Sequence, residues 1–147
     1  MRVLVQRVKE ARVTIDDQSV GEIGQGLLVL HCAEAGDKPE DADFLARKIA
    51  KMRIFPDADG KTNLSVQDVG GAVLAVSQFT LAADWRKGNR PGFSRAAEPA
   101  LAEQLYDDFC AALKENGLPL ETGRFAAQMD VSLVNDGPFT IWMDTND

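Results

Sequence analysis

The sequence of 147 residues contains one histidine and two cysteines, which restricts the chemistry it can carry. His31 lies in the apolar segment LLVLHC, where a histidine is more often a buried, hydrogen-bonded core residue than a base or a ligand. Cys32 and Cys110 are far apart and form no CxxC pair. We therefore expect no metal site, no histidine-based triad, and two buried free thiols of the kind found in a reducing compartment.

Long apolar runs and phosphate-binding glycine motifs are also missing. No apolar run approaches the roughly 20 residues that a membrane span needs. The first residues, MRVLVQRVKE, become charged too early for a signal peptide. Neither GxxxxGKS/T nor GxGxxG occurs, which excludes nucleotide binding through those motifs. The sequence thus predicts a cytoplasmic protein with no cofactor, no metal and no membrane partner.

Positive charge is in short supply. The formal net charge is −7 and the pI is about 4.7, whereas proteins that grip nucleic acid through its phosphates are usually basic. A nucleic-acid partner must therefore meet a local patch, and a duplex-binding module is disfavoured. The length and the absence of repeats, linkers and low-complexity segments predict one domain over residues 1–147.

The hydrophobic pattern predicts an α/β fold, a layered β/β/α domain with mixed, largely antiparallel β-sheets and two helices. Helices are expected from Asp37 onward and from about Pro99 to Asn116, with a turn at 57–61. A tight connection is expected at Asn135–Pro138, between the last two strands. The predicted strands cover residues 2–8 and 11–16 (as a hairpin), a short segment near 20, and residues 24–36, 70–83, 127–134 and 138–143.

Polar residues interrupt the end of a strand that is otherwise apolar. In VLAVSQFTLAA, Ser77, Gln78 and Thr80 stand where an apolar core strand is expected to continue. One interpretation is that these side chains only satisfy backbone groups at a strand end, which is common. The other is that hydroxyl groups and exposed backbone N–H groups line the mouth of a pocket. Spacing alone does not decide between the two.

The following loop, RKGNRPGFSR at residues 86–95, carries four positive charges and no negative charge. Such a loop is usually just solvated. Against a net charge of −7, however, it is also a candidate site for an anionic ligand, and Phe93 within it is a candidate for stacking on a base.

Several segments together resemble the D-aminoacyl-tRNA deacylase family. They are SQFTLAA (77–83), GNRPGF (88–93) and TGRFAAQMDVSLVNDGPFT (122–140), supported by VQRV (5–8) and GEIGQGLLVL (21–30). The resemblance covers essentially the whole chain in the same order. It implies a homodimeric, cytoplasmic enzyme that hydrolyses the ester bond of D-aminoacyl-tRNA, and of mischarged glycyl-tRNA, releasing the amino acid and the tRNA.

The resemblance also implies how the substrate's handedness is read. Its Gly-Pro peptide, here Gly137-Pro138, is cis and inserts into the active site of the partner subunit. That backbone then forms a wall that an L-amino acid's side chain strikes and a D-amino acid avoids, so selectivity comes from rejection. Arg7 is expected to orient the Gly-Pro element, and Phe125 and Met129 are expected to lie near the pocket.

For the reaction, the family match places the catalytic residues at Ser77, Gln78, Phe79 and Thr80. We expect the backbone N–H of Phe79 to stabilise the oxyanion, Ser77 and Thr80 to shape the site, and Gln78 to hold the strand end. No histidine or lysine in the sequence is placed to activate Thr80 as a nucleophile. Water is therefore expected to attack, assisted by the 2′-hydroxyl of the terminal adenosine.

Contacts to the 3′ end of the aminoacylated tRNA are expected from Arg86, Lys87 and Arg90. One position departs from the family pattern, because Gly92 stands where the loop usually carries serine in RPSF. That change removes a hydroxyl contact and leaves the backbone path. Two alternatives stay open: a non-catalytic dimeric module that binds a nucleic-acid 3′ end, and a hydrolase of another small ester or amide.

Overall fold

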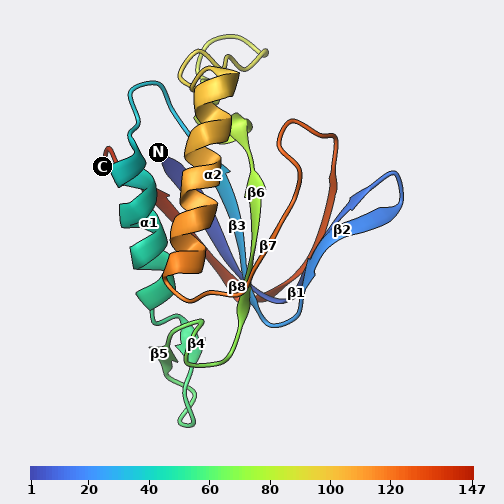
Figure 1. The fold of residues 1–147 in the computed structure, drawn as a ribbon, viewed down its shortest axis with the longest axis vertical. Helices are drawn as coiled ribbons and strands as arrows, with labels where there is room; N and C mark the ends of the chain where they lie inside the picture. Colours follow the sequence, from blue (N-terminus) through green and yellow to red (C-terminus); the bar gives the residue numbers. More distant parts are fainter.

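The computed structural model describes residues 1–147 and contains a six-stranded mixed sheet with two helices on one of its faces (Figure 1). The predicted fold class is confirmed. The helices are α1 (Pro39–Lys51), α2 (Pro99–Glu115) and the short 3₁₀ helix η1 (Phe79–Ala82). The strands are β1 (Arg2–Ile15), β2 (Gln18–Ile23), β3 (Gly26–Cys32), β4 (Phe55–Pro56), β5 (Thr62–Leu64), β6 (Ala72–Ser77), β7 (Leu120–Thr122) and β8 (Asp130–Asp144).

The main sheet has the order β2-β1-β3-β6-β7, and β8 pairs with β1. The three pairings made by β1 are antiparallel, whereas β3–β6 and β6–β7 are parallel. The parallel register sets His31 opposite Ser77, so β3 and β6 end at the same edge of the sheet. In α/β sheets this edge, beyond the carboxyl ends of the strands, is where ligands usually bind.

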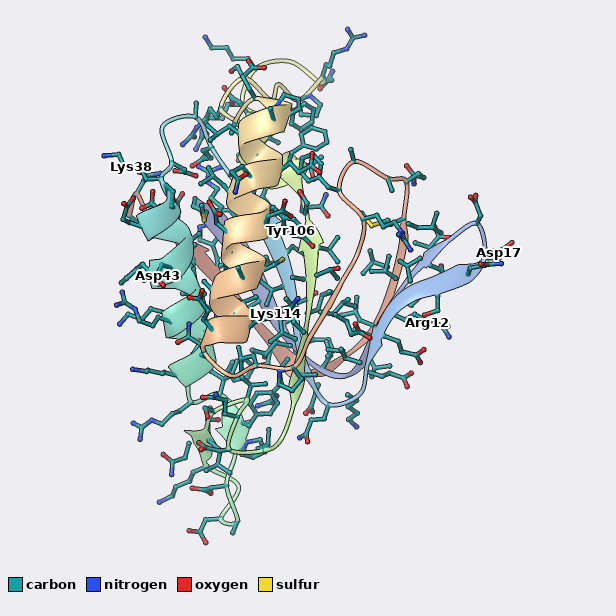
Figure 2. The ribbon with its side chains drawn as sticks, viewed as in Figure 1. Arg12, Asp17, Lys38, Asp43, Tyr106 and Lys114 are labelled. Atoms are coloured by element: carbon teal, nitrogen blue, oxygen red, sulfur yellow. The ribbon has the colours of Figure 1, made fainter.

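The predicted hairpin at 2–8 and 11–16 is wrong, because residues 2–15 form one continuous strand. No turn-forming residue interrupts this segment, and its apolar alternation therefore runs on. The first half of β1 pairs with β3 and the second half with β2. The chain reverses only at Asp16 and Asp17, whose φ angles of 49° and 64° suit a tight hairpin turn (Asp17, Figure 2).

The two strands predicted near 127–134 and 138–143 are also one strand, β8, which runs along β1. Asn135 lies opposite Val8, and Thr140 lies opposite Gln6. Four residues of β8 therefore face a single residue of β1, Arg7, which makes a large bulge in the strand. The Asn-Asp-Gly-Pro sequence forms this bulge within one long strand rather than a hairpin.

The other elements follow the sequence closely. Both helices appear where predicted, each with a proline in its first turn, and residues 57–61 form the turn between β4 and β5. Gly117, with φ of +83°, follows the end of α2. The strand predicted at 70–83 ends at Ser77 and continues as η1. Strands β4, β5 and β7 were not predicted, because they have only two or three residues each.

The main core lies between the two helices and the sheet and contains 23 buried residues. His31 is buried there and stacks on Phe109 at 4.6 Å between ring centres. Its Nε2 atom has no hydrogen-bond partner, contrary to the expectation of a hydrogen-bonded histidine. Both cysteines are free; Cys32 is buried and Cys110 is partly buried. Neither helix is long and apolar enough to cross a membrane.

Candidate functional site

A cavity of about 680 Å³ opens at the edge where β3 and β6 end. Its lining is mostly apolar and comes from the end of β6, the start of α2 and the segment before β8. Five of the residues predicted from the sequence line it together: Ser77, Gln78, Phe79, Phe125 and Met129. An apolar cavity with a few polar groups at its mouth is the usual form of a small-molecule site.

The end of β6 presents unpaired backbone donors to this cavity. The Gln78 N–H still donates to the His31 carbonyl at 2.7 Å, as in the preceding ladder. The chain then turns into η1, whose first N–H groups have no acceptor within the helix. The Phe79 N–H donates no hydrogen bond within the chain, and Phe79 is 56% exposed. Because Phe79 lines the cavity and its N–H has no acceptor, this N–H is a candidate donor to a ligand at the cavity mouth.

Thr80 lies on the exposed side of the same turn and does not line the cavity. Its Oγ1 accepts a hydrogen bond from Nε2 of Gln78. No histidine, lysine or carboxylate side chain bonds to this hydroxyl. The surroundings of Thr80 thus lack the base that would turn a hydroxyl into a nucleophile.

The thiol of Cys32 also lines the cavity, and its Sγ lies 3.6 Å from the Phe79 carbonyl oxygen, to which it donates. Burial, together with the charge of Glu34, raises the pKa of Cys32 to about 11. The thiol is therefore neutral at physiological pH. Because the thiolate is the reactive form, Cys32 serves as an apolar wall rather than a nucleophile.

The opposite wall of the cavity comes from the segment that carries Phe125 and Met129. Tyr106 of α2, which Figure 2 labels between that helix and β6, packs against Phe125 with ring centres 6.3 Å apart. Its hydroxyl donates to the Ala75 carbonyl at 2.8 Å. Gly123 permits a close approach, since an added Cβ would lie 2.7 Å from Sδ of Met129. These contacts fix the wall without help from charged groups.

Gly137 and Pro138 do not line this cavity. Their peptide bond is cis, as the resemblance implied, and both residues are exposed on the bulge of β8. A methyl group added at Gly137 would overlap the backbone nitrogen of Phe139. The bulge therefore presents bare backbone to the surroundings, outside its own chain's cavity.

Arg7 and Asn135 clamp the bulge from the inside. The Arg7 guanidinium donates from Nε to the Asp136 carbonyl at 3.0 Å and from Nη1 to the Ile54 carbonyl at 2.6 Å. It also lies over the Phe139 ring, 4.6 Å from its centre. The predicted orienting role of Arg7 is consistent with these contacts.

Asn135 was not among the residues predicted for the site. Its Nδ2 donates to the carbonyls of Arg7 at 2.8 Å and Phe139 at 3.0 Å, while its Oδ1 accepts from the Phe139 N–H at 3.2 Å. The amide thus closes the bulge at its base. The only signal in the sequence was an asparagine at the point where the apolar alternation stops.

The loop of residues 86–95, which carries four positive charges, lies beside the mouth of the cavity. Asp84 and Gly92 pair through two backbone hydrogen bonds of 2.8 and 2.9 Å, which pins the base of the loop and keeps its path with glycine at position 92. Phe93 packs edge-on against Phe79 with ring centres 5.1 Å apart. Phe93 therefore lies beside the mouth, against Phe79, although it does not line the cavity itself. The exposed cations of the loop are Arg86, Lys87, Arg90 and Arg95.

A cluster of ion pairs that was not predicted holds η1 to the sheet. Arg2 donates from Nε to Oδ2 of Asp144 at 2.8 Å and from Nη1 to the Leu81 carbonyl at 2.9 Å. Buried Glu34 lies 3.4 Å from the same Nε. Burial acts to raise the pKa of Asp144, but the Asn146 N–H and the bond and charge of Arg2 outweigh it and lower that pKa. Arg2 therefore anchors the turn that carries Phe79.

Comparison with known proteins assigns the family. The D-Tyr-tRNA(Tyr) deacylase family model matches residues 4–144. The chain is 62% identical to a D-aminoacyl-tRNA deacylase of Ruegeria pomeroyi over 144 residues, covering 98% of this chain and 99% of that protein. It is 61% identical to a D-aminoacyl-tRNA deacylase of Paracoccus denitrificans over 147 residues, covering 100% of this chain and 99% of the relative.

Two solved structures share the fold. One is titled c-Myc DNA unwinding element binding protein and has a TM-score of 0.92 at 37% identity, with 99% of each chain covered. The other is a probable eukaryotic D-amino acid tRNA deacylase with a TM-score of 0.83 at 17% identity and 97% of each chain covered, a likeness of fold alone. On these matches, the chain belongs to the D-Tyr-tRNA(Tyr) deacylase family.

Proposed function

We propose that this enzyme, a D-aminoacyl-tRNA deacylase, hydrolyses the ester that joins a D-amino acid, or a misplaced glycine, to the terminal adenosine of a tRNA. Family membership over nearly the whole chain supports the reaction class. The single observation that carries the catalytic part of the proposal is the unpaired Phe79 N–H at the mouth of an apolar cavity.

Ester hydrolysis places negative charge on the carbonyl oxygen in the transition state. A backbone N–H that already points to this position stabilises that charge, and one such donor is typically worth about 10²–10³ in kcat. The Phe79 N–H supplies it in our proposal. Ser77 lines the mouth, and Thr80 shapes it from outside the cavity by accepting a hydrogen bond from Gln78, which also bonds to His31. An aminoacyl ester is already activated, so positioning and this donor suffice.

Water attacks the ester in this proposal, with the 2′-hydroxyl of the adenosine as the assisting group. The side chains near the mouth argue against a covalent route. Thr80 has no neighbouring base, and the pKa of Cys32 is raised to about 11. His31 is buried in the core and is not part of the cavity lining. Ser77 lines the cavity, but its hydroxyl has no hydrogen bond to a histidine, lysine or carboxylate side chain that would activate it. We therefore assign the assisting role to the substrate's own hydroxyl.

Handedness is read by a second subunit. Gly137 and Pro138 are exposed, lie outside their own chain's cavity and are held in shape by Arg7 and Asn135. In a homodimer, we place this bare backbone in the partner's cavity. An L side chain strikes it there, whereas a D side chain points past it. Arg86, Lys87 and Arg90 contact the tRNA phosphates in the same proposal.

Mixing two inactive variants tests the shared site. Phe79→Pro removes the N–H at the first position of η1, where proline is well tolerated. Phe79→Ala keeps the N–H and controls for the lost ring. Gly137→Ala distorts the Gly-Pro element, which is the half of each site that the partner chain supplies.

Mixed dimers of the Phe79→Pro and Gly137→Ala chains contain one intact site out of two. After statistical reassociation, D-tyrosyl-tRNA deacylation should therefore return to about a quarter of the wild-type rate in a two-fold dimer. Activity no higher than the average of the two separate variants would contradict a site built from two chains. Binding of the tRNA end by wild type without turnover would instead support the non-catalytic alternative.

A further inference from the structure

Trp85 is the most exposed of the large hydrophobic side chains, with 71% of its surface accessible. The guanidinium of Arg86 lies over its ring, 5.3 Å from the centre. Leaving an indole in water forgoes the free energy of burying it. Tryptophan and arginine are also among the residue types most enriched at the energetic centres of binding surfaces. These features are typical of a residue that binds a ligand or a partner.

The position of Trp85 ties it to the catalytic mouth. It lies in the loop that leaves η1 and that the Asp84–Gly92 pair closes at its base. This loop stands beyond the start of α2, next to the end of β6 (Figure 1). The contact between Phe93 and Phe79 joins the far side of the loop to the cavity mouth. A chain that leaves the cavity on this side thus meets the loop.

The charge of the loop selects among possible occupants. Residues 86–95 carry four positive charges and no negative charge in a chain of net charge −7. Single-stranded nucleic acid fits both features, because its phosphates bind cations and its bases stack on aromatic rings. A second copy of this acidic chain would also offer negative charge to these cations, but it would not supply the planar bases that stack on an exposed indole.

We propose that Trp85 stacks on a base of the single-stranded RNA that immediately precedes the esterified adenosine, with Arg86 neutralising the adjoining phosphate. This inference rests on the proposed function, which places the adenosine ester in the cavity. It goes beyond that function by adding a subsite for a second nucleotide. The subsite strengthens the capture of an RNA end and takes no part in the chemistry at the ester.

Substrates of increasing length separate capture from chemistry. The values of kcat/KM are measured for D-tyrosyl esters of adenosine and of the trinucleotide CCA, with wild type, Trp85→Ala and Trp85→Phe. For the CCA ester, the alanine variant should lose roughly tenfold, as truncation of a base-stacking aromatic typically does. The phenylalanine variant should lose less, and the adenosine ester should react at nearly the wild-type rate. Equal losses on both esters, or no loss on the CCA ester, would overturn the proposal.

A second measurement does not depend on turnover. The chain has two tryptophans, so Trp142→Phe leaves Trp85 as the sole indole fluorophore. Titration with uncharged CCA should quench this fluorescence, and titration with adenosine should quench it far less. Quenching without any D-ester hydrolysis by wild type would refute the deacylase proposal but keep the base subsite. No quenching with CCA, or a change of oligomeric state in Trp85→Ala that shows a second copy covering the indole, would refute the subsite.

Discussion

The buried histidine makes the stability of this fold depend on pH in a calculable way. His31 is 1% exposed, stacks on Phe109 and has no hydrogen-bond partner at Nε2. Burial, and secondarily the positive charge of the Met1 ammonium group, lowers the pKa of His31 from 6.5 to about 3. The folded protein therefore keeps this imidazole neutral over a pH range in which the unfolded chain protonates it.

The sign of the effect follows from proton binding. Between pH 6.5 and about 3, the unfolded state binds one proton more than the folded state at His31, so stability falls as the pH falls. The slope is about 1.36 kcal/mol per pH unit, which gives a loss of about 2.5 kcal/mol between pH 7 and pH 4.5. At neutral pH, this contribution to the free energy of unfolding is nearly zero.

Urea unfolding of wild type and His31→Leu at pH 7.0, 5.5 and 4.5 checks this prediction. The carboxylates titrate in both proteins, so the difference between the two free energies of unfolding isolates His31. We expect that difference to shift by about 2.5 kcal/mol in favour of the leucine variant as the pH falls to 4.5. A difference that stays constant across the three pH values would refute the neutral, buried state of His31.

Three further substitutions test the site and its support. Thr80→Val should lower kcat by less than about tenfold, because Thr80 shapes the mouth without forming a covalent bond. The prediction would be wrong if the variant lost all turnover but still bound a non-hydrolysable analogue, and if an acyl-enzyme could be trapped from wild type. Arg86→Glu combined with Lys87→Glu should raise KM for tRNA and spare aminoacyl-adenosine; equal losses on both would remove these residues from tRNA binding. Arg2→Met removes the ion-pair partner of nearly buried Asp144 and leaves Glu34 paired only with exposed Arg95, so urea unfolding should show a loss of about 3 kcal/mol. A loss below about 1 kcal/mol would show that the cluster is not a structural anchor.

Local patterns in the sequence predicted the local features of the fold. The proline and acidic residues that open α1, the apolar spacing of α2 and the glycine that follows it lie within single segments. The polar interruption at Ser77 and Gln78 marked a true strand end, which the structure places at the mouth of the cavity. Such signals need no knowledge of which strand pairs with which.

The sequence did not predict which segments pair when they lie far apart in the chain. The bulge at Asn135–Pro138 has the composition of a hairpin turn, and only pairing of both flanks with the same strand, β1, shows that the chain continues onward. The clamp from Arg7 joins positions about 130 residues apart in the chain. The Arg2 cluster likewise joins the first strand to the last one and to η1. Periodicity within a window carries no information on contacts of this range.

The most direct test of the account is the deacylation of D-tyrosyl-tRNA and L-tyrosyl-tRNA, measured side by side with wild type and Gly137→Ala. The account predicts rapid hydrolysis of the D-ester alone by wild type. The added methyl group, which overlaps the backbone of Phe139, should displace the Gly-Pro element within the shared site and slow that reaction strongly. Hydrolysis of both esters at equal rates by wild type, or of neither faster than in buffer, would contradict the account.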